Sequence, residues 1–234
     1  MKIKISAFLA AFFSFLIPLV SCGREGNAAE KISQIRRDIL RGETEDFLLT
    51  AFCERRESPF LEDGEAGNAS DCLIFTLTDK TEGEFRGQPA LKFSVEKEEY
   101  LVRFPPDLLS PTRRAEVRVK TLPEGILTCE LFFGEERRTV ELLSVRKAGT
   151  AAPEEAVKVL LSSGNDRAKE FLSLPRSEIR VRLLEHGGFL YYYAGVVAAD
   201  EDGRISAVSF LLDGETLEVL AVREEERKKS NESE

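Results

Sequence analysis

The residue types that most often carry out chemistry are sparse in this chain. His186 is its only histidine, and no Gly-x-Ser-x-Gly motif is present to supply it with a nucleophilic serine. A single histidine also excludes a metal centre built from a histidine cluster. Asp200-Glu201-Asp202-Gly203 is dense in carboxylates but lacks the distal glutamate and the spacing of a calcium loop, so we interpret it as a hairpin turn. The sequence therefore predicts a protein that is not an enzyme and that holds no metal and no cofactor.

Three cysteines lie in the body of the chain. Cys53, Cys72 and Cys129 include no C-x-x-C spacing, so neither a redox motif nor a zinc knuckle is indicated. Cys53 and Cys72 flank the longest polar loop, and a disulfide between them would close about 20 residues and contribute about 3 kcal/mol by loop entropy. A bridge between Cys53 and Cys129, or three buried reduced thiols, are the alternatives.

The fourth cysteine, Cys22, ends a segment of a different kind. Met1-Lys2-Ile3-Lys4 is basic, and residues 5–20 form an apolar run followed by Ser21. This run is interrupted by Ser14 and Pro18, and it is shorter than the roughly 20 residues that a membrane-spanning helix needs. The pattern predicts a secretory signal peptide over residues 1–21.

The last four residues of this segment, Leu19-Val20-Ser21-Cys22, resemble the lipobox of bacterial lipoproteins. In that family a diacylglycerol is attached to the cysteine, the signal is cleaved before it, and the new amino terminus is acylated. The resemblance implies that Cys22 becomes the first residue of an exported protein, anchored by lipid to a membrane of the bacterial cell envelope. Gly23 is not the acidic residue that retains some lipoproteins in the inner membrane, so the choice of membrane stays open.

The charge of the chain limits its partners. Loss of Lys2 and Lys4 with the signal peptide takes the formal net charge from -9 to -11. A chain this acidic is a poor ligand for nucleic acid, whose phosphates require clustered lysine and arginine. Anionic lipid headgroups also repel it, so membrane affinity must come from the N-terminal lipid.

Residues 22–43 read as a lipidated tether followed by a short helix. Ile32, Ile35 and Ile39 recur at helical spacing between Glu30 and Arg41, and Gly42 stands where such a helix would end.

The hydrophobic period changes to two over residues 44–147. About seven short apolar stretches, separated by turn residues, predict an immunoglobulin-like antiparallel sandwich, and a small barrel would give the same pattern. The expected strands cover residues 47–53, 73–77, 90–95, 100–104, 115–122, 126–133 and 139–145.

Residues 148–223 predict an α+β domain in which a helix packs on an antiparallel meander. Pro153 suits the first turn of a helix, and Asn165 is placed to cap a second one. Gly- and Asp-rich turns, including His186-Gly187-Gly188, separate the strands expected over residues 178–184, 189–198, 204–212 and 217–222. The charged residues 224–234 predict a disordered tail.

This last domain resembles the PepSY family, in which a helix opening with Pro-Glu-Glu-Ala precedes a meander ending near Val-Asp-Ala-x-Thr-Gly-Glu-Val-Leu. Here the chain has Pro153-Glu154-Glu155-Ala156 and Leu212-Asp213-Gly214-Glu215-Thr216-Leu217-Glu218-Val219-Leu220, with Leu217 in place of the glycine. The resemblance implies a module that binds or restrains peptidases and other envelope proteins and that carries no catalytic residues.

Tyr191, Tyr192 and Tyr193 fall within one expected strand. Alternation places Tyr191 and Tyr193 on one face and Tyr192 on the other. One face must cover the helix, and exposed aromatic side chains on the other would suit a partner-binding surface, although two core tyrosines and one rim tyrosine fit the pattern as well.

Together these observations predict a membrane-anchored lipoprotein that acts as a protein-binding or peptide-binding scaffold of the cell envelope. A carrier of a small apolar ligand in a barrel cavity, and an envelope enzyme using carboxylates that the sequence does not identify, are the alternatives.

The anchor can be tested directly. Cys22→Ala removes the acceptor thiol, so we expect the precursor to stay unacylated and unprocessed. Its electrophoretic mobility and its partitioning into detergent should both change relative to the parent chain. Unchanged mobility and partitioning would contradict lipidation at Cys22.

Overall fold

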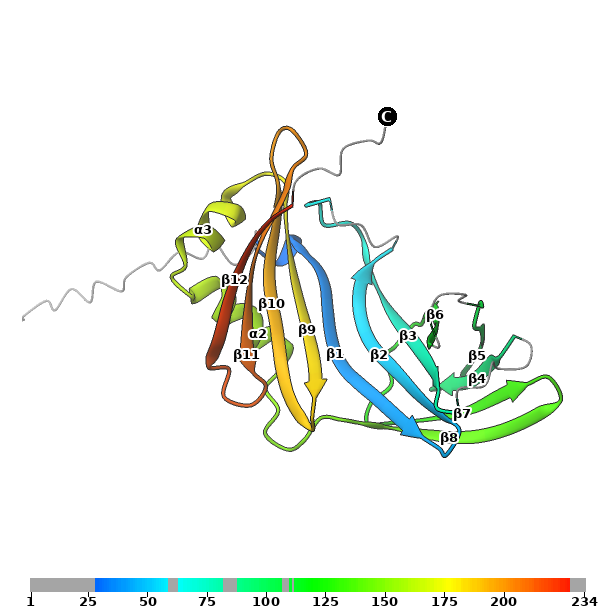
Figure 1. The fold of residues 1–234 in the computed structure, drawn as a ribbon. Coiled ribbons are helices and arrows are strands. Elements are labelled where there is room, and N and C mark those ends of the chain that lie inside the picture. The colour runs from blue at the N-terminus through cyan, green and yellow to red at the C-terminus, as the bar shows by residue number, and fades with distance from the viewer. Residues whose placement is uncertain (1–27, 59–62, 82–87, 107–109, 111, 228–234) are drawn as a thin grey trace, which may run out of the picture.

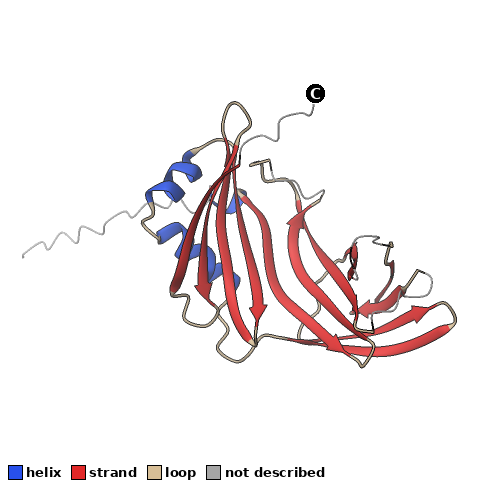
Figure 2. Ribbon diagram, in the orientation of Figure 1, coloured by secondary structure: helices blue, strands red, loops and turns tan. Residues whose placement is uncertain are grey.

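The chain folds mainly into β-strands, as predicted (Figures 1 and 2). The computed structural model describes residues 28–58, 63–81, 88–106, 110 and 112–227. The elements in chain order are β1 (Ile32–Glu43), β2 (Phe47–Glu57), β3 (Ala69–Asp79), β4 (Ala90–Val95), β5 (Glu98–Arg103), β6 (Thr112–Arg118), β7 (Ile126–Phe133), β8 (Glu136–Ser144), α2 (Pro153–Ser162), α3 (Asp166–Ser173), β9 (Ser177–His186), β10 (Phe189–Ala199), β11 (Ile205–Asp213) and β12 (Val219–Arg227).

All twelve strands belong to one mixed sheet, and β1 is its central connection. The main path runs β12-β11-β10-β9-β1-β8-β7-β4-β5, and β2, β3 and β6 branch from β1 in that order. On one side of β1, its first half pairs in parallel with β9 and its second half pairs antiparallel with β8. Its other side pairs antiparallel with β2 along nearly its whole length. Figure 1 shows β9–β12 on one side of β1, and β2, β3 and β4–β8 on the other.

The helix predicted between Glu30 and Arg41 is wrong, because these residues form most of β1. A β-bulge lies between Arg36 and Asp38, where the register with β2 shifts by one residue. A second irregularity, in the pairing with β9, lies between Ile32 and Gln34. Such interruptions break the period of two, and the spacings of three and four residues between Ile32, Ile35 and Ile39 imitate a helix. The strand is also flanked by partners on both sides and buried along much of its length, so strict alternation of apolar and polar residues is not required of it.

Two hydrophobic cores lie along this sheet. The first core fills the space between β1–β8 and contains Phe47, Phe75 and Phe104, each of which is almost fully buried. The second core lies between β9–β12 and the two helices. The division falls near residues 147 and 148, but residues 22–43, predicted as a tether and a short helix, supply the strand that joins the two parts.

Both predicted helices of the second half are present. The backbone N–H of Ala152 donates to the Glu155 carboxylate at 2.9 Å at the start of α2. The Asn165 side chain accepts a hydrogen bond of 2.9 Å from the Ala168 N–H at the start of α3, as expected of an N-cap. The helices pack on β9, β10 and β11, and Figure 2 shows them together on one side of these strands.

The strands after the helices form the predicted meander. Gly187 and Gly188 have φ values of +60° and +80°, which is the backbone of a two-residue hairpin turn between β9 and β10. Strand β12 continues to Arg227, so the prediction of disorder from Glu224 onward is wrong for residues 224–227. Pairing with β11 and two ion pairs, Arg223–Glu225 and Arg167–Glu226, accompany this ordered segment. Residues 228–234 lie outside the described part of the chain.

Gly42 provides a test of how closely β1 and β8 pack. A Cβ atom at Gly42 would lie 2.6 Å from the carbonyl oxygen of Glu141 and 2.7 Å from Cδ2 of Leu142. Backbone atoms cannot yield as a flexible side chain would, so we expect Gly42→Ala to lower the free energy of unfolding by about 1–3 kcal/mol. Denaturant unfolding measures this loss.

Ser94→Ala is the matched control, because Ser94 is an exposed position of β4. It should change the free energy of unfolding by less than about 0.5 kcal/mol. Equal stability of the Gly42→Ala variant and the control would contradict the close approach of the two strands.

Candidate functional site

The three consecutive tyrosines of β10 lie on two faces of the sheet. Tyr192 is fully buried in the second core, and its hydroxyl donates a hydrogen bond of 2.7 Å to the Ala151 carbonyl oxygen. Burial raises the pKa of this hydroxyl. Tyr191 and Tyr193 point to the opposite side and are half-buried. At the three tyrosines the face opposite the helices is the more exposed one, whereas Val197 and Ala199, further along the same face, are buried.

Tyr193 belongs to a row of side chains that crosses five strands. Residues directly opposite in adjacent strands share a face of the sheet. Tyr193 is opposite Arg182, Arg182 is opposite Arg36, Arg36 is opposite Glu54, and Glu54 is opposite Cys72. We call the side of the sheet that carries this row the helix-free face, because Tyr192 and the helices lie on the other side.

Polar side chains on the helix-free face form hydrogen bonds that link β9, β1 and β2. The Arg36 Nε donates to one oxygen of Glu54 at 2.6 Å, and the Gln34 amide donates to the other oxygen at 2.6 Å. The Arg182 Nε donates in turn to the Gln34 carbonyl oxygen. We call these four residues, Arg182, Gln34, Arg36 and Glu54, the polar ladder.

Further ion pairs flank the polar ladder. Arg180 pairs with Glu178 on β9, and Arg56 on β2 pairs with Glu116 on β6. Glu54 and Glu178 are both 0% exposed. Carboxylates at this depth require partners, since an unpaired buried charge costs several kcal/mol.

Aromatic rings border the ladder at both ends. The Arg36 guanidinium lies 4.1 Å from the centroid of the Phe52 ring, and that of Arg182 lies 5.7 Å from the Tyr193 ring. Burial lowers the pKa of Arg182, and the neighbouring positive charges lower it further. These contacts fix side-chain positions at the parallel β1–β9 junction. The polar ladder therefore holds β9 in register with β1 and β2.

The loop between β2 and β3 closes one end of the helix-free face. Arg176, just before β9, donates from Nη2 to the Asp63 carbonyl oxygen at 3.0 Å and forms an ion pair with Glu65 at 2.8 Å. A Cβ at Gly64 would lie 2.9 Å from the backbone nitrogen of Ala199. The loop therefore packs directly against the start of β9 and the end of β10.

The predicted disulfide between Cys53 and Cys72 is wrong. Cys53 is opposite Leu73 and Cys72 is opposite Glu54, so the two thiols point to opposite faces of the sheet. Both are free and buried, as is Cys129. Burial raises the pKa of Cys72 and of Cys129 to about 12, and burial raises that of Cys53 as well. Such thiols are inert near neutral pH because the reactive species is the thiolate.

The other candidates from the sequence are turn residues. His186 ends β9 at the hairpin and is exposed. The Asp200 carboxylate accepts a hydrogen bond of 2.7 Å from the Arg204 N–H, which commits it to the turn between β10 and β11. Within the described residues, no group of three or more His, Cys, Asp or Glu side chains is arranged to hold a metal ion.

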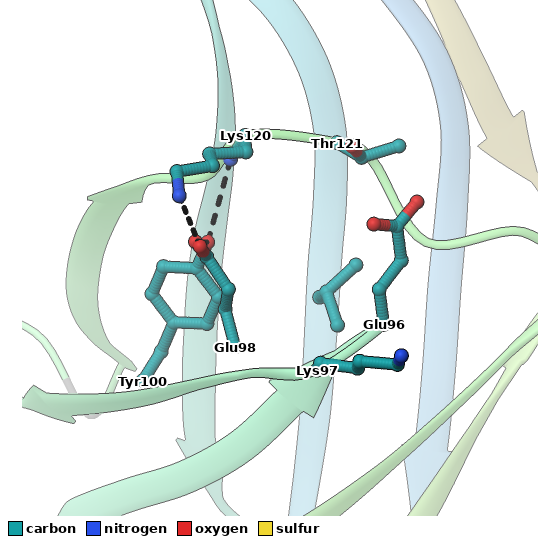
Figure 3. Close-up of a pocket in the computed structure, with 7 residues that line it drawn as sticks. Glu96, Lys97, Glu98, Tyr100, Lys120 and Thr121 are labelled. Atoms are coloured by element: carbon teal, nitrogen blue, oxygen red, sulfur yellow. Dashed lines mark hydrogen bonds and ion pairs between the residues drawn. The ribbon is translucent and has the colours of Figure 1, made fainter.

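An open hollow of about 640 Å³ lies at the β4–β5 hairpin (Figure 3). Glu98 forms an ion pair with Lys120 and accepts a hydrogen bond of 3.0 Å from the Tyr100 hydroxyl. The bond to Lys120 lowers the pKa of Glu98, and the same bond raises the pKa of Lys120. The hollow is thus lined by charges that neutralise one another. Its residues are Val95, Glu96, Lys97, Glu98, Tyr100, Lys120 and Thr121.

The edge of the sheet at β12 carries three exposed apolar side chains. In the part of the chain that the structure describes, β12 pairs with β11 alone. Val219, Leu220 and Val222 are 43%, 47% and 47% exposed. An uncovered edge strand with apolar side chains is a template for pairing with another chain.

Cys22 lies outside the described residues, and lipidation there stays a prediction. Among the residues that the structure describes, no helix combines the length and the apolar character needed to span a bilayer. No protein-family model matches this chain, and comparisons with curated proteins and with solved structures likewise find no match.

Sequence reasoning missed the polar ladder and did not identify β12 as the free edge. Glu178, Arg180 and Arg182 alternate with Ile179, Val181 and Leu183, which is the pattern of a strand with one solvated face. Only the curvature of the sheet and its parallel pairing bury the charged side. Three charged residues of mixed sign at every second position of a strand were the pattern in the sequence that could have indicated the polar ladder.

Removal of one charge tests the ladder. Glu54→Gln leaves Arg36 buried without its carboxylate partner, so we expect the free energy of unfolding to fall by about 3–5 kcal/mol. Glu130→Gln is the matched control, because Glu130 pairs with Arg137 at the surface and should contribute less than about 1 kcal/mol. Similar losses in the two variants, measured by denaturant unfolding, would show that the ladder does not hold the junction.

Proposed function

We propose that this chain is a lipid-anchored protein of the bacterial cell envelope that binds other proteins or peptides through the β9–β12 half and performs no catalysis. The observations that carry the proposal are the partly exposed Tyr191 and Tyr193 on the helix-free face and the exposed β12 edge of this half. The helices bury Tyr192, whereas Tyr191, Tyr193 and the apolar side chains of β12 stay accessible. Partly exposed aromatic rings and an open sheet edge are features that peptide-binding surfaces use.

We further propose that residues 148–223 form a PepSY-like unit. Helix α2 begins at Pro153, and the antiparallel meander β9–β12 follows the helices, as the resemblance implies. Leu217 stands where that family has glycine, and its φ is +59°. This left-handed backbone is one that glycine adopts without strain, so the local conformation at the point of departure is compatible with the family.

For β1–β8, the part that contains the domain predicted over residues 44–147, we favour the small-barrel alternative over two separate sheets. The strands follow one hydrogen-bonded path, β6-β3-β2-β1-β8-β7-β4-β5. Its two ends are linked because Glu98 at the start of β5 pairs with Lys120, two residues beyond β6. Phenylalanine and leucine side chains occupy the space inside, which favours a supporting role for this half over the carriage of an apolar ligand.

Crosslinking in intact envelopes tests the proposed function. Tyr193→Ala removes a half-buried ring from the helix-free face, so capture of the crosslinked partner should fall about fivefold or more, as expected of an aromatic anchor worth at least about 1 kcal/mol. Mass spectrometry of the crosslinked material identifies and quantifies the partner. Tyr191→Ala should also lower the capture of the crosslinked partner.

Tyr192 supplies the controls. Tyr192→Phe loses the bond to Ala151 and should cost about 1 kcal/mol of stability while leaving capture intact. Tyr192→Ala should cost about 3–5 kcal/mol by analogy with phenylalanine. Unchanged capture in both the Tyr191 and Tyr193 variants, with the fold retained, would move the binding site away from this face.

A further inference from the structure

We infer that Gly195 is a positioning residue of the helix-free face: it leaves free the space that the end of the Tyr193 side chain occupies, and so sets the direction in which this ring meets a partner. This inference rests on the proposed function and adds to it a residue that acts through Tyr193. Its consequence is that capture falls when Tyr193 keeps its ring but changes its direction.

The backbone of β10 does not itself require a glycine at position 195. Glycine weakens the interior of a strand, and it is found there where the strand has a bulge, a left-handed residue or a close approach of other atoms. The register of β10 with both β9 and β11 runs past Gly195 without a shift. The φ angle of Gly195 also lies outside the left-handed region. A close approach is therefore the reason that remains.

The atoms that approach Gly195 most closely belong to Tyr193. A Cβ atom at position 195 would lie 2.8 Å from Oη of Tyr193, 3.1 Å from Cζ and 3.2 Å from Cε1. Residues 193 and 195 share the helix-free face, and side chains of a strand lean along its direction. The end of the Tyr193 side chain therefore covers the backbone at Gly195, which is buried although Tyr193 is only half-buried.

Gly195 differs in this respect from Gly42 and Gly214. A Cβ atom at either of those positions would lie 2.6 Å from a backbone carbonyl oxygen, that of Glu141 or that of Leu190. A backbone atom cannot move without disturbing the sheet, whereas the end of a tyrosine side chain can turn away. We therefore expect a side chain at position 195 to displace Tyr193 and to leave the fold in place.

Arg182 contacts the Tyr193 ring from the neighbouring strand. It is directly opposite Tyr193 on β9, and its guanidinium group lies 5.7 Å from the centroid of the ring. The polar ladder fixes this arginine in turn, since its Nε donates to the Gln34 carbonyl oxygen. A ring confined by two such neighbours loses less conformational entropy on binding than one that rotates freely.

The first measurement is capture by crosslinking in intact envelopes, as for the Tyr193 variants. Gly195→Ala should lower capture of the crosslinked partner about threefold or more, as expected when one side chain must be ordered again on binding. Ser209→Thr is the matched control, because it adds a methyl group at the residue directly opposite Gly195 on the same face. It should leave capture unchanged.

Combined variants show whether Gly195 acts through Tyr193. Tyr193→Phe removes Oη, the atom nearest to the added Cβ, and leaves contacts that need to give by only a few tenths of an ångström. Gly195→Ala should therefore lower capture less in the Tyr193→Phe background than in the parent chain. In the Tyr193→Ala background it should cause no further loss.

A spectroscopic measurement follows the ring without a partner. It uses the purified full-length chain in detergent micelles, labelled with ¹³C in tyrosine and glycine. In the parent chain we expect nuclear Overhauser effects between the ring protons of Tyr193 and the Hα protons of Gly195. In the Gly195→Ala variant the Tyr193 ring signals should shift, while those of Tyr100, which is on β5, should stay in place.

Absence of the Tyr193–Gly195 contact in the parent chain would overturn the inference, even if the Gly195→Ala variant does not fold. A displaced Tyr193 ring with unchanged capture would also overturn it. So would an equal loss from Gly195→Ala in the parent and Tyr193→Ala backgrounds, or an equal loss from Ser209→Thr. Each of these results leaves the proposed function standing if Tyr193→Ala lowers capture. Unchanged capture in both the Tyr191→Ala and Tyr193→Ala variants would overturn the proposed function, and with it the role of Gly195 in binding.

Discussion

The pairing of β1 with three different strands is the constraint on which the rest of the structure depends. Its first half continues the β9–β12 meander, and its second half continues the sheet that surrounds the first core. The bulge between Arg36 and Asp38 lies between these two halves, where the strand changes neighbour from β9 to β8. Bulges bend a strand and increase its twist. One extra residue can therefore bend a continuous sheet so that its two parts pack against separate cores.

The polar ladder is a consequence of this change of direction. A sheet that bends at β1 brings the helix-free faces of β9 and β2 toward each other, and the side chains between them lose contact with water. Apolar side chains would fill the same space with less cost, and a buried ion pair is weak support for stability alone. Its benefit is specificity: Arg182, Gln34, Arg36 and Glu54 can satisfy one another only when β9, β1 and β2 are in one register. A slip of one residue in any of these strands would move the ladder side chains of that strand to the other face.

Local sequence signals predicted most of the helices and strands, whereas features that depend on contacts between distant residues were missed. The β4 and β7 strands coincide with the predicted ranges, the Asn165 cap forms, and the hairpin glycines have the expected backbone. These features depend on residues adjacent in the chain. The nature of β1, the position of Cys72 relative to Cys53 and the burial of Glu178 depend on pairing between distant strands, which a hydrophobic period does not encode. The same holds for the site: alternation separated Tyr192 from its neighbours, but only the topology identified β12 as an edge.

The register also relates the edge to the anchor. Ile32, Ile179, Val196, Val208 and Glu224 are successive partners across β1, β9, β10, β11 and β12. Ile32 and Glu224 are therefore about 19 Å apart across the sheet, at four strand spacings. Lys31 fixes the chain at this point, since its ammonium group donates to the carbonyl oxygens of Leu172 and Leu174 and to the Ser177 hydroxyl. A lipid on Cys22 would be at most about 35 Å of extended chain from Ile32. If Cys22 is lipidated, as proposed, the length of this segment and the width of the sheet together set an upper limit on the distance between the lipid and Glu224.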